Sequence, residues 1–321
     1  MQASGYFPNK RAKNPGVRFK YIIMKIRKIL FMAVLLLFCT LLTRAQETRI
    51  IPQEMIYKHV NGTGLKVYIF STPEDKQDKQ QPAIAFFHGG GWVFGKPQEF
   101  FGACERYARK GFVTFSFQYR LSMQDDGTYP HPDITPVESV RDARSAMRWL
   151  RENASYLGID PGRIVAGGQS AGGQLALSTA LLDDINEVSD NPDISPVPDA
   201  LLLFSSSVNT MEAWIDWILG DKRNQIWAIS PYHNLRKNMP PAIGFHGEDD
   251  CMVPIYVIRL FREKMEELGN PYELIIYPGQ GHYLGEGNEA YSGLFNEEIL
   301  ERTDVFLDGL GYMGKGGNFQ K

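Results

Sequence analysis

Short runs of apolar residues alternate along this chain with longer segments in which apolar residues recur at helical spacing. Runs such as 83–87 and 200–204 are continuously apolar, which is typical of strands buried on both faces of a sheet. The segment 137–156 instead carries its apolar residues on one stripe, as an amphipathic helix does. This alternation predicts an α/β fold, a mostly parallel sheet with helices on both faces.

The first two apolar segments depart from the parallel pattern. Residues 55–60 and 65–70 flank the sequence Asn61-Gly62-Thr63-Gly64, and both alternate apolar with polar side chains. Asn-Gly between alternating segments is a strong hairpin signal, because both residues tolerate a positive φ. We therefore expect an N-terminal antiparallel hairpin at one edge of the sheet.

The remaining segments continue the alternation. Further strands are expected within 112–119, 164–168, 240–246 and 272–277, and a turn at 158–163. Further helices are expected over 99–110, 171–182, 255–268 and 294–307. The segment 209–238 contains Trp214, Trp217 and Trp227, and we interpret it as an insertion over the C-terminal edge of the sheet, where ligands bind in open α/β folds.

Length and charge limit the classes of protein that fit. The chain has 321 residues, a net charge of -3, 43% hydrophobic and 22% charged residues, which is ordinary globular composition. This suits a single large α/β domain over residues 46–321, with the small insertion at 209–238. A charge so close to neutral gives no reason to expect nucleic acid as a partner.

The N-terminal region resembles a targeting segment. Basic residues after Met24 precede the apolar stretch 29–42, and small residues follow at the two positions that a signal peptidase reads, with cleavage before Gln46. We interpret residues 1–45 as an upstream extension and a signal peptide, with the start at Met24. The expected location is secreted or periplasmic, with no stable membrane partner after cleavage. An N-terminal membrane anchor is the alternative.

Two cysteines, Cys104 and Cys251, lie beyond the predicted signal peptide. They could pair in an oxidising compartment, but two cysteines do not make a disulfide framework. We expect two separate buried thiols.

One serine lies between two pairs of glycines. Residues 168–172 read Gly-Gln-Ser-Ala-Gly and follow a predicted strand where a helix begins. This G-x-S-x-G pattern, in that context, is typical of a sharp turn that exposes a nucleophilic hydroxyl above a sheet. We therefore take Ser170 as the candidate nucleophile, with Gly168 and Gly172 needed by the turn and Gly167 and Gly173 by close packing of strand and helix.

A serine needs a base and the base needs an acid that orients it. His282 lies in a glycine-rich loop after the last predicted strand and is the candidate base. His246 ends a strand, where a structural hydrogen bond is the simpler role, and His233 lies in the insertion. Of the acidic residues at 248–250, Asp250 is the favoured acid, with Asp249 as the alternative.

A glycine-rich loop after strand 83–87 completes the candidate site. It reads His-Gly-Gly-Gly-Trp at 88–92, and backbone N–H groups of Gly90 and Gly91, together with that of Ala171, could bind an oxyanion. Trp92, Gln169 and Trp214 are candidate substrate-pocket residues. No His-x-x-x-His or clustered Cys/His spacing is present, so we expect neither a metal nor another cofactor.

Together these motifs resemble the α/β-hydrolase superfamily, in the branch of hormone-sensitive-lipase-like esterases and of bacterial feruloyl and acetyl esterases. The resemblance rests on the motifs at 88–92, 119–121, 157–177, 246–254 and 279–282. It implies that Ser170 is the nucleophile, Asp250 the acid and His282 the base, with Gly90, Gly91 and Ala171 as the oxyanion donors.

Three departures separate this chain from hormone-sensitive-lipase-like members. Gln169 stands where they usually have aspartate, "SMQDD" replaces the usual "APE" after Tyr119-Arg120-Leu121, and the large helical cap has no counterpart before the first core strand. The chain is more similar to secreted esterases that remove acyl groups from plant or algal polysaccharides.

The function expected from these residues is a secreted serine carboxylesterase, acting on a small-molecule or polysaccharide ester with short-chain acyl, acetyl or feruloyl groups. A serine peptidase of the prolyl-oligopeptidase-like type is the alternative, since it shares the fold and the serine turn. A non-enzymatic binding protein is disfavoured, because the serine, the histidine and the oxyanion glycines are all present.

Overall fold

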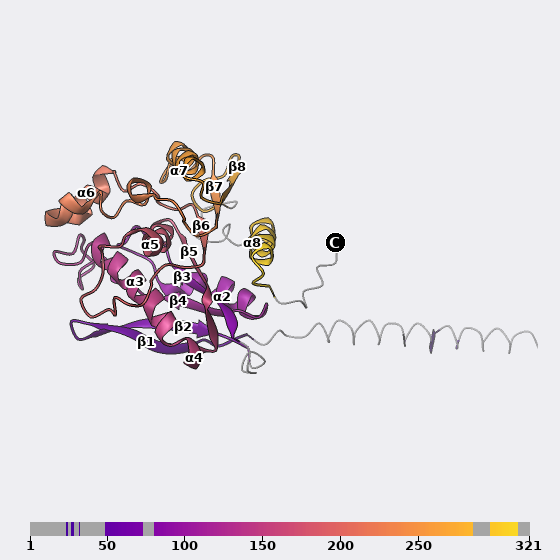
Figure 1. Ribbon diagram of the computed structural model, residues 1–321. Helices are drawn as coiled ribbons and strands as arrows, with labels where there is room; N and C mark the ends of the chain where they lie inside the picture. The colour runs from indigo at the N-terminus through magenta and orange to yellow at the C-terminus, as the bar shows by residue number, and fades with distance from the viewer. Residues whose placement is uncertain are drawn as a thin grey trace, which may run out of the picture. The chain divides into compact units, whose positions relative to one another are not determined.

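The computed structural model describes residues 49–72, 80–284 and 296–313, together with positions 24, 27, 28 and 32. Contacts divide the chain into the units Met1–Arg49 and Ile50–Lys321, and the second holds the whole fold described below (Figure 1). Apart from those four positions, the predicted extension and signal peptide at 1–45 lie outside the described residues. Within the described residues, no helix is both long and apolar enough to cross a membrane.

The described strands form one eight-stranded sheet with the order β1-β2-β4-β3-β5-β6-β7-β8. Figure 1 shows this order running from the β1–β2 hairpin at one end to β8 at the other. The strands are β1 (Gln53–Val60), β2 (Thr63–Phe70), β3 (Gln81–Phe87), β4 (Val113–Phe117), β5 (Ile159–Gln169), β6 (Ala200–Phe204), β7 (Ala242–Gly247) and β8 (Tyr272–Tyr277).

The pairing confirms the predicted mixed sheet. Strands β1 and β2 form an antiparallel hairpin, in which Asn61 and Gly62 both adopt a positive φ, 49° and 80°. Strand β2 also pairs antiparallel with β4, and every pairing from β4 through β8 is parallel. The antiparallel edge therefore joins a parallel core, as the sequence predicts.

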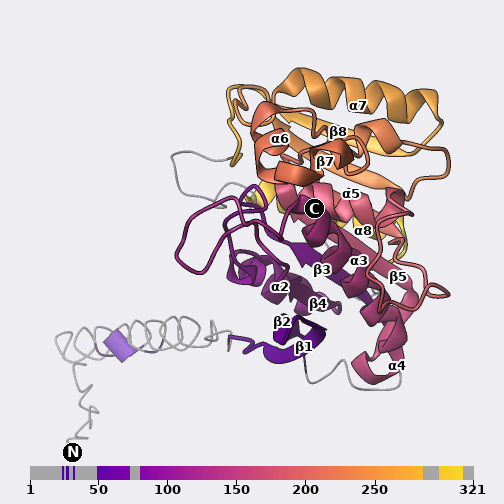
Figure 2. The ribbon, with the colours of Figure 1, turned by 90° about the vertical axis from the view of Figure 1, so that its left-hand side faces the viewer.

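The helices cover both faces of the sheet. They are α2 (Phe101–Ala108), α3 (Pro136–Glu152), α4 (Ala154–Leu157), α5 (Ala171–Leu181), α6 (Ala213–Leu219), α7 (Ile255–Glu267) and α8 (Glu297–Gly309), with short 3₁₀ turns η2 (Pro97–Phe100), η3 (Gly220–Gln225) and η4 (Tyr232–Asn234). Figure 2 shows α7 running beside β8 at the end opposite the hairpin, and α7 contacts that strand.

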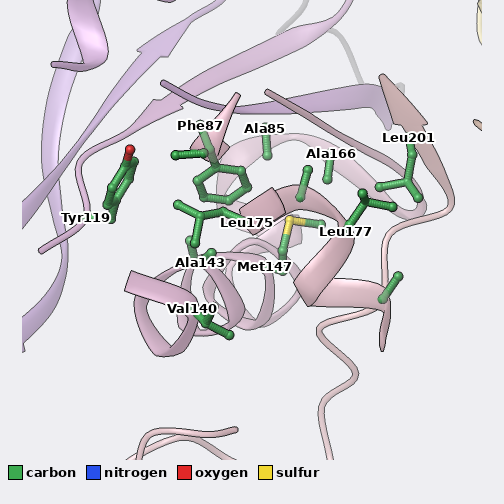
Figure 3. Packing of buried hydrophobic residues seen from close by; sticks show 14 of the residues in the cluster. Ala85, Phe87, Tyr119, Val140, Ala143, Met147, Ala166, Leu175, Leu177 and Leu201 are labelled. Carbon is green, nitrogen blue, oxygen red and sulfur yellow. The ribbon is translucent and has the colours of Figure 1, made fainter. Parts of the chain in front are cut away.

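Strand β3 shows how the core is divided. Ala83, Ala85 and Phe87 face one apolar cluster, which includes residues of α3 and α5, whereas Ile84 and Phe86 face the other, which includes residues of α2 and α8. Figure 3 shows Ala85 and Phe87 on the side that also holds Val140, Ala143, Met147 and Leu175. Alternate side chains of a strand point to opposite faces, so a strand covered on both sides must be apolar throughout.

Two elements differ from the predictions in their boundaries. The helix predicted over 137–156 is split at Asn153 into α3 and α4, and α3 begins after Thr135, whose hydroxyl forms a capping box with Glu138. The turn predicted at 158–163 belongs largely to β5, which keeps one pair to β3 at Ile159 and resumes regular pairing at Ile164. The insertion 209–238 contains α6, η3 and η4.

Candidate active site

Ser170 lies at the junction of β5 and α5, in a conformation that few non-glycine residues adopt. Its φ is 54° and its ψ is -117°. A Cβ on Gly168 would overlap the backbone of Gly172, and a Cβ on Gly172 would overlap the carbonyl oxygens of Phe87 and His88. The turn therefore requires glycine at both positions, because any side chain would push the helix away from β5 and from the end of β3.

The outer two glycines allow close packing, but mainly against elements other than the strand and helix that were predicted to need it. A Cβ on Gly173 would overlap the hydroxyl of Ser206, and one on Gly167 would lie 3.1 Å from the Phe86 ring. Neither glycine has a positive φ. Their role is to let β5 and α5 approach neighbouring elements.

The loop after β3 forms a tight turn beside this junction. Gly90 and Gly91 have φ values of 103° and 61°, and the Gly90 carbonyl accepts hydrogen bonds from the N–H groups of Val93 and Phe94 at 3.1 and 2.8 Å. Among the described residues, the N–H groups of Gly90, Gly91 and Ala171 donate no hydrogen bond. These three donors are therefore available to a ligand oxygen.

His88, the first residue of this loop, anchors it to Tyr119. Its ring stacks on Tyr119 with centroids 4.3 Å apart, its Nδ1–H donates to the Gly89 carbonyl at 2.8 Å, and the Tyr119 hydroxyl donates to the His88 carbonyl at 2.8 Å. Burial lowers the pKa of His88 to about 4. The ring is therefore neutral at neutral pH and acts as a structural support for the loop.

Asp250 and His282 meet above the C-terminal end of β7. The Asp250 Oδ2 lies 2.7 Å from the His282 Nδ1, and Oδ1 accepts the N–H groups of Met252 and Val253 at 2.8 Å each. Burial by itself raises the pKa of Asp250, but the hydrogen bond and charge of His282 and the Val253 N–H outweigh it and lower the pKa. The carboxylate thus stays ionised and holds a proton on the Nδ1 of His282.

The other candidates occupy different places. Asp249 is exposed, whereas Asp250 is buried. The Nε2 of His246 donates to the Val253 carbonyl at 2.8 Å and lies 3.3 Å from the Asp250 Oδ2. His246 therefore packs against the acid in a structural role. His233 contacts the Ser230 hydroxyl within the insertion.

The Nε2 of His282 faces Gln169. The amide nitrogen of Gln169 lies 3.0 Å from the His282 Nε2, and within the described residues no hydrogen bond joins the Ser170 hydroxyl to this histidine. An amide nitrogen can only donate, and Nδ1 already carries the ring proton, so Nε2 accepts from Gln169. Gln169 was predicted only as a pocket residue, and nothing in the local sequence signals this contact.

A cavity of about 680 Å³ brings these residues together. It is lined by Gly90, Gly91, Trp92, Val93, Phe94, Tyr129, Gln169, Ser170, Ser207, Glu212, Trp214, Trp217, Cys251, Met252, Val253, His282 and Tyr283. The three predicted pocket residues Trp92, Gln169 and Trp214 are therefore all in its wall. Sequence reasoning missed Phe94, Glu212 and Met252 as lining residues.

The tryptophans differ in their placement. Trp92 is buried and its indole N–H donates to Gln174 at 3.0 Å, whereas Trp214 and Trp217 are about half exposed at the cavity. A Cβ on Gly91 would lie 2.6 Å from the Trp214 ring, so this ring covers the oxyanion loop directly. Trp227 does not line the cavity.

The cysteines are both unpaired, as expected, but only Cys104 is buried. The expectation that Cys251 is buried is wrong. It lies in the exposed bend that turns back from Asp250 toward α7, where the two backbone N–H groups that follow it point at the carboxylate. In the described part of the chain, no group of three or more His, Cys, Asp or Glu side chains could hold a metal ion.

The sheet order, the strained serine between β5 and α5, and the acid and histidine after β7 and β8 define an α/β-hydrolase. The BD-FAE family model matches residues 68–265, so the chain belongs to the BD-FAE family, within the esterase and lipase branch of these hydrolases.

Solved structures of esterase 2 from the planctomycete Thermogutta terrifontis are similar to this chain. Its form phosphoramylated by tabun is 35% identical, with a TM-score of 0.73, and the match covers 82% of this chain and 96% of that one. Its propionate-bound form is 34% identical, with a TM-score of 0.73, and covers 86% and 99%.

Curated relatives match over a smaller part of their own length. Esterase LipC of Mycobacterium tuberculosis is 26% identical over 228 residues, which cover 65% of this chain and 54% of LipC. Endo-1,4-beta-xylanase B of Butyrivibrio fibrisolvens is 26% identical over 267 residues, which cover 78% of this chain and 40% of the xylanase. The chain thus spans about half the length, or less, of these curated relatives.

The buried His88 predicts a pH dependence of stability. An unfolded histidine has a pKa of about 6.5, so between that pH and about 4 the unfolded chain binds more protons than the folded one. The free energy of unfolding should therefore fall as the pH drops through this window, by up to about 3 kcal/mol from this group. Urea unfolding of the wild type and of His88→Gln between pH 7 and 4.5 measures the difference. Equal pH dependence in the two proteins would contradict the assignment.

Proposed function

We propose that this protein is a serine carboxylesterase. The observation that carries the proposal is the 2.7 Å contact between Asp250 and His282, because His282 lines the same cavity as Ser170, Gly90 and Gly91. Among the described residues, the N–H groups of Gly90, Gly91 and the adjacent Ala171 donate no hydrogen bond. A nucleophile, a base oriented by an acid, and donors for an oxyanion are the parts that acyl transfer needs. The esterase relatives support ester cleavage over the peptidase alternative.

The reaction follows from these positions. The Nε2 of His282 takes the proton of the Ser170 hydroxyl while its oxygen bonds to the ester carbonyl carbon. The carbonyl oxygen becomes negative and is stabilised by the N–H groups of Gly90, Gly91 and Ala171. His282 then gives the proton to the leaving alcohol as the ester bond breaks. Water, deprotonated by His282, cleaves the acyl-serine and restores the site.

Gln169 has to release His282 before this sequence can begin. Its amide donates to the lone pair that must accept the serine proton, and after proton transfer Nε2 carries hydrogen and repels the same amide. The described arrangement is therefore a resting state in which Gln169 competes with Ser170 for Nε2. Rotation of the Gln169 side chain, whose oxygen can accept from the imidazolium, resolves the competition.

The substrate proposed is an ester of a short acyl group, acetyl or feruloyl, carried by a small alcohol or by a plant or algal polysaccharide. A propionate-bound relative supports a short acyl group, and a xylanase among the relatives supports a polysaccharide context. Half-exposed Trp217 and Tyr129 offer faces on which sugar or phenyl rings stack. The signal-like segment 24–45 supports a secreted or periplasmic location, which sequencing the N-terminus of exported protein would test, with Gln46 as the expected first residue.

Replacing the nucleophile tests the mechanism. We expect Ser170→Ala to lower kcat/KM for p-nitrophenyl acetate by about 10⁴-fold or more, because the acyl-enzyme can no longer form. Ser155→Ala, on exposed α4, is the matched control and should keep full activity. A fluorophosphonate probe should label the control and not the variant. Equal turnover by Ser170→Ala and the wild type would exclude Ser170 from the mechanism. A panel of acetyl, butyryl and feruloyl esters with acetylated xylan then defines the substrate.

Changing Gln169 tests the competition for His282. Gln169→Met keeps the length of the side chain and removes the donor, and since a hydrogen bond is worth about 1 kcal/mol, kcat should rise about fivefold with little change in KM. Gln169→Glu places an acceptor there, which would hold the imidazolium away from Ser170 and lower kcat. A Gln169→Met variant that loses tenfold or more in kcat, with an unchanged melting temperature, would show that the amide assists the reaction instead.

A further inference from the structure

Glu212 stands apart from the other residues that line the catalytic cavity. Of the lining residues that the structure describes, it is the one aspartate, glutamate, lysine or arginine. It precedes α6, in the insertion that the sequence pattern placed over the edge of the sheet. The mechanism assigns it no step, because the acid that orients His282 is Asp250.

Among the residues that the structure describes, the carboxylate of Glu212 has no cationic partner. It is half-buried, it accepts a hydrogen bond from the side chain of Trp214, and it makes no ion pair with any described residue. Burial raises the pKa of Glu212 and the nearby charge of Asp250 raises it further, against the lowering effect of the Trp214 hydrogen bond. A carboxylate in such a place costs free energy that a cation in the cavity would offset.

Aromatic rings form much of the remaining wall. Phe94 and Tyr129 meet edge to face with centroids 5.2 Å apart, and Tyr129 meets Trp217 in the same way at 5.7 Å. These three side chains come from three separate segments and are between 44% and 50% exposed, so their faces are open to a ligand. The face of an aromatic ring carries partial negative charge and attracts cations, quaternary ammonium groups in particular.

We propose that the cavity binds esters that carry an ammonium group, in either the acyl or the alcohol part, with the cation between Glu212 and the aromatic faces of Tyr129, Trp214 and Trp217. The carboxylate and the ring faces attract a cation, and the rings also supply apolar contact area. A neutral ester gains nothing from the negative charge, and an anionic ester is repelled by it. That the ligand is an ester rests on the proposed esterase function. That the cavity binds a cation rests only on the residues that line it.

Direct binding separates the two claims. The probes are 3-(trimethylammonio)phenol and 3-tert-butylphenol, which share size and shape and differ by one charge. Calorimetry with the full chain gives the ratio of the Kd of the neutral phenol to that of the cation. We expect Glu212→Gln to lower this ratio at least fivefold. Asp216→Asn, which changes an acid of the same helix outside the cavity wall, should alter it less than twofold.

Salt supplies a measurement that needs no variant. Raising KCl from about 50 to 500 mM should weaken binding of the cation to the wild type and leave the neutral phenol unchanged, because screening acts on the charge alone. The proposal would be overturned if the Kd ratio of Glu212→Gln stayed within twofold of the wild-type ratio. It would also be overturned if Asp216→Asn lowered the ratio as much as Glu212→Gln does. Cation binding that depends on Glu212 in a protein that cleaves no ester would instead overturn the proposed function and leave the cation site standing.

Discussion

The close backbone contact between α5 and the end of β3 is the constraint on which the site depends. A Cβ on Gly172 would overlap the carbonyl oxygens of Phe87 and His88, so the helix can lie there only without a side chain. Strands β3 and β5 are paired with Phe87 opposite Gly168. The oxyanion loop after β3 and the serine turn after β5 therefore begin at the same level of the sheet. This is why the N–H of Ala171 lies beside the oxyanion loop, which no local preference of either segment would achieve.

The electrostatics of the cavity follow from two carboxylates with different partners. Asp250 is satisfied by two backbone N–H groups and by His282, and this holds it ionised although it is buried. In the described part of the chain, the carboxylate of Glu212 has the Trp214 side chain as its one hydrogen-bond partner, and the negative charge of Asp250 raises its pKa. One carboxylate is therefore committed to orienting the base, and the other remains open to a ligand. The separation of roles arises from hydrogen-bond partners and not from residue type.

The sequence predicts most of the fold because its signals are local. Period-two and helical patterns identify the strands and helices, Asn61-Gly62 identifies the hairpin, and the glycines around Ser170 identify the turn. What it misses depends on contacts between distant segments. Four separate segments supply the partly buried ion cluster of Lys58, Arg120, Asp142 and Glu187. The exposure of Cys251 depends on how the chain turns toward α7. Such pairings depend on the packed fold, so no short window of sequence contains them.

Gln169 and Glu212 show why the candidate site is less predictable than its motifs. The residues expected to act in catalysis lie just after the ends of strands, and the sheet fixes the positions of those strand ends. Glu212 and Trp214 come from the insertion, which lies between β6 and β7 in the sequence and packs on α3 and α5. The insertion contacts the oxyanion loop at Gly91, because the absence of a side chain there lets the Trp214 ring lie on the loop. Because Trp214 lines the cavity and lies against Gly91, we expect a change in the insertion to affect both the choice of substrate and the position of the N–H groups that stabilise the developing charge.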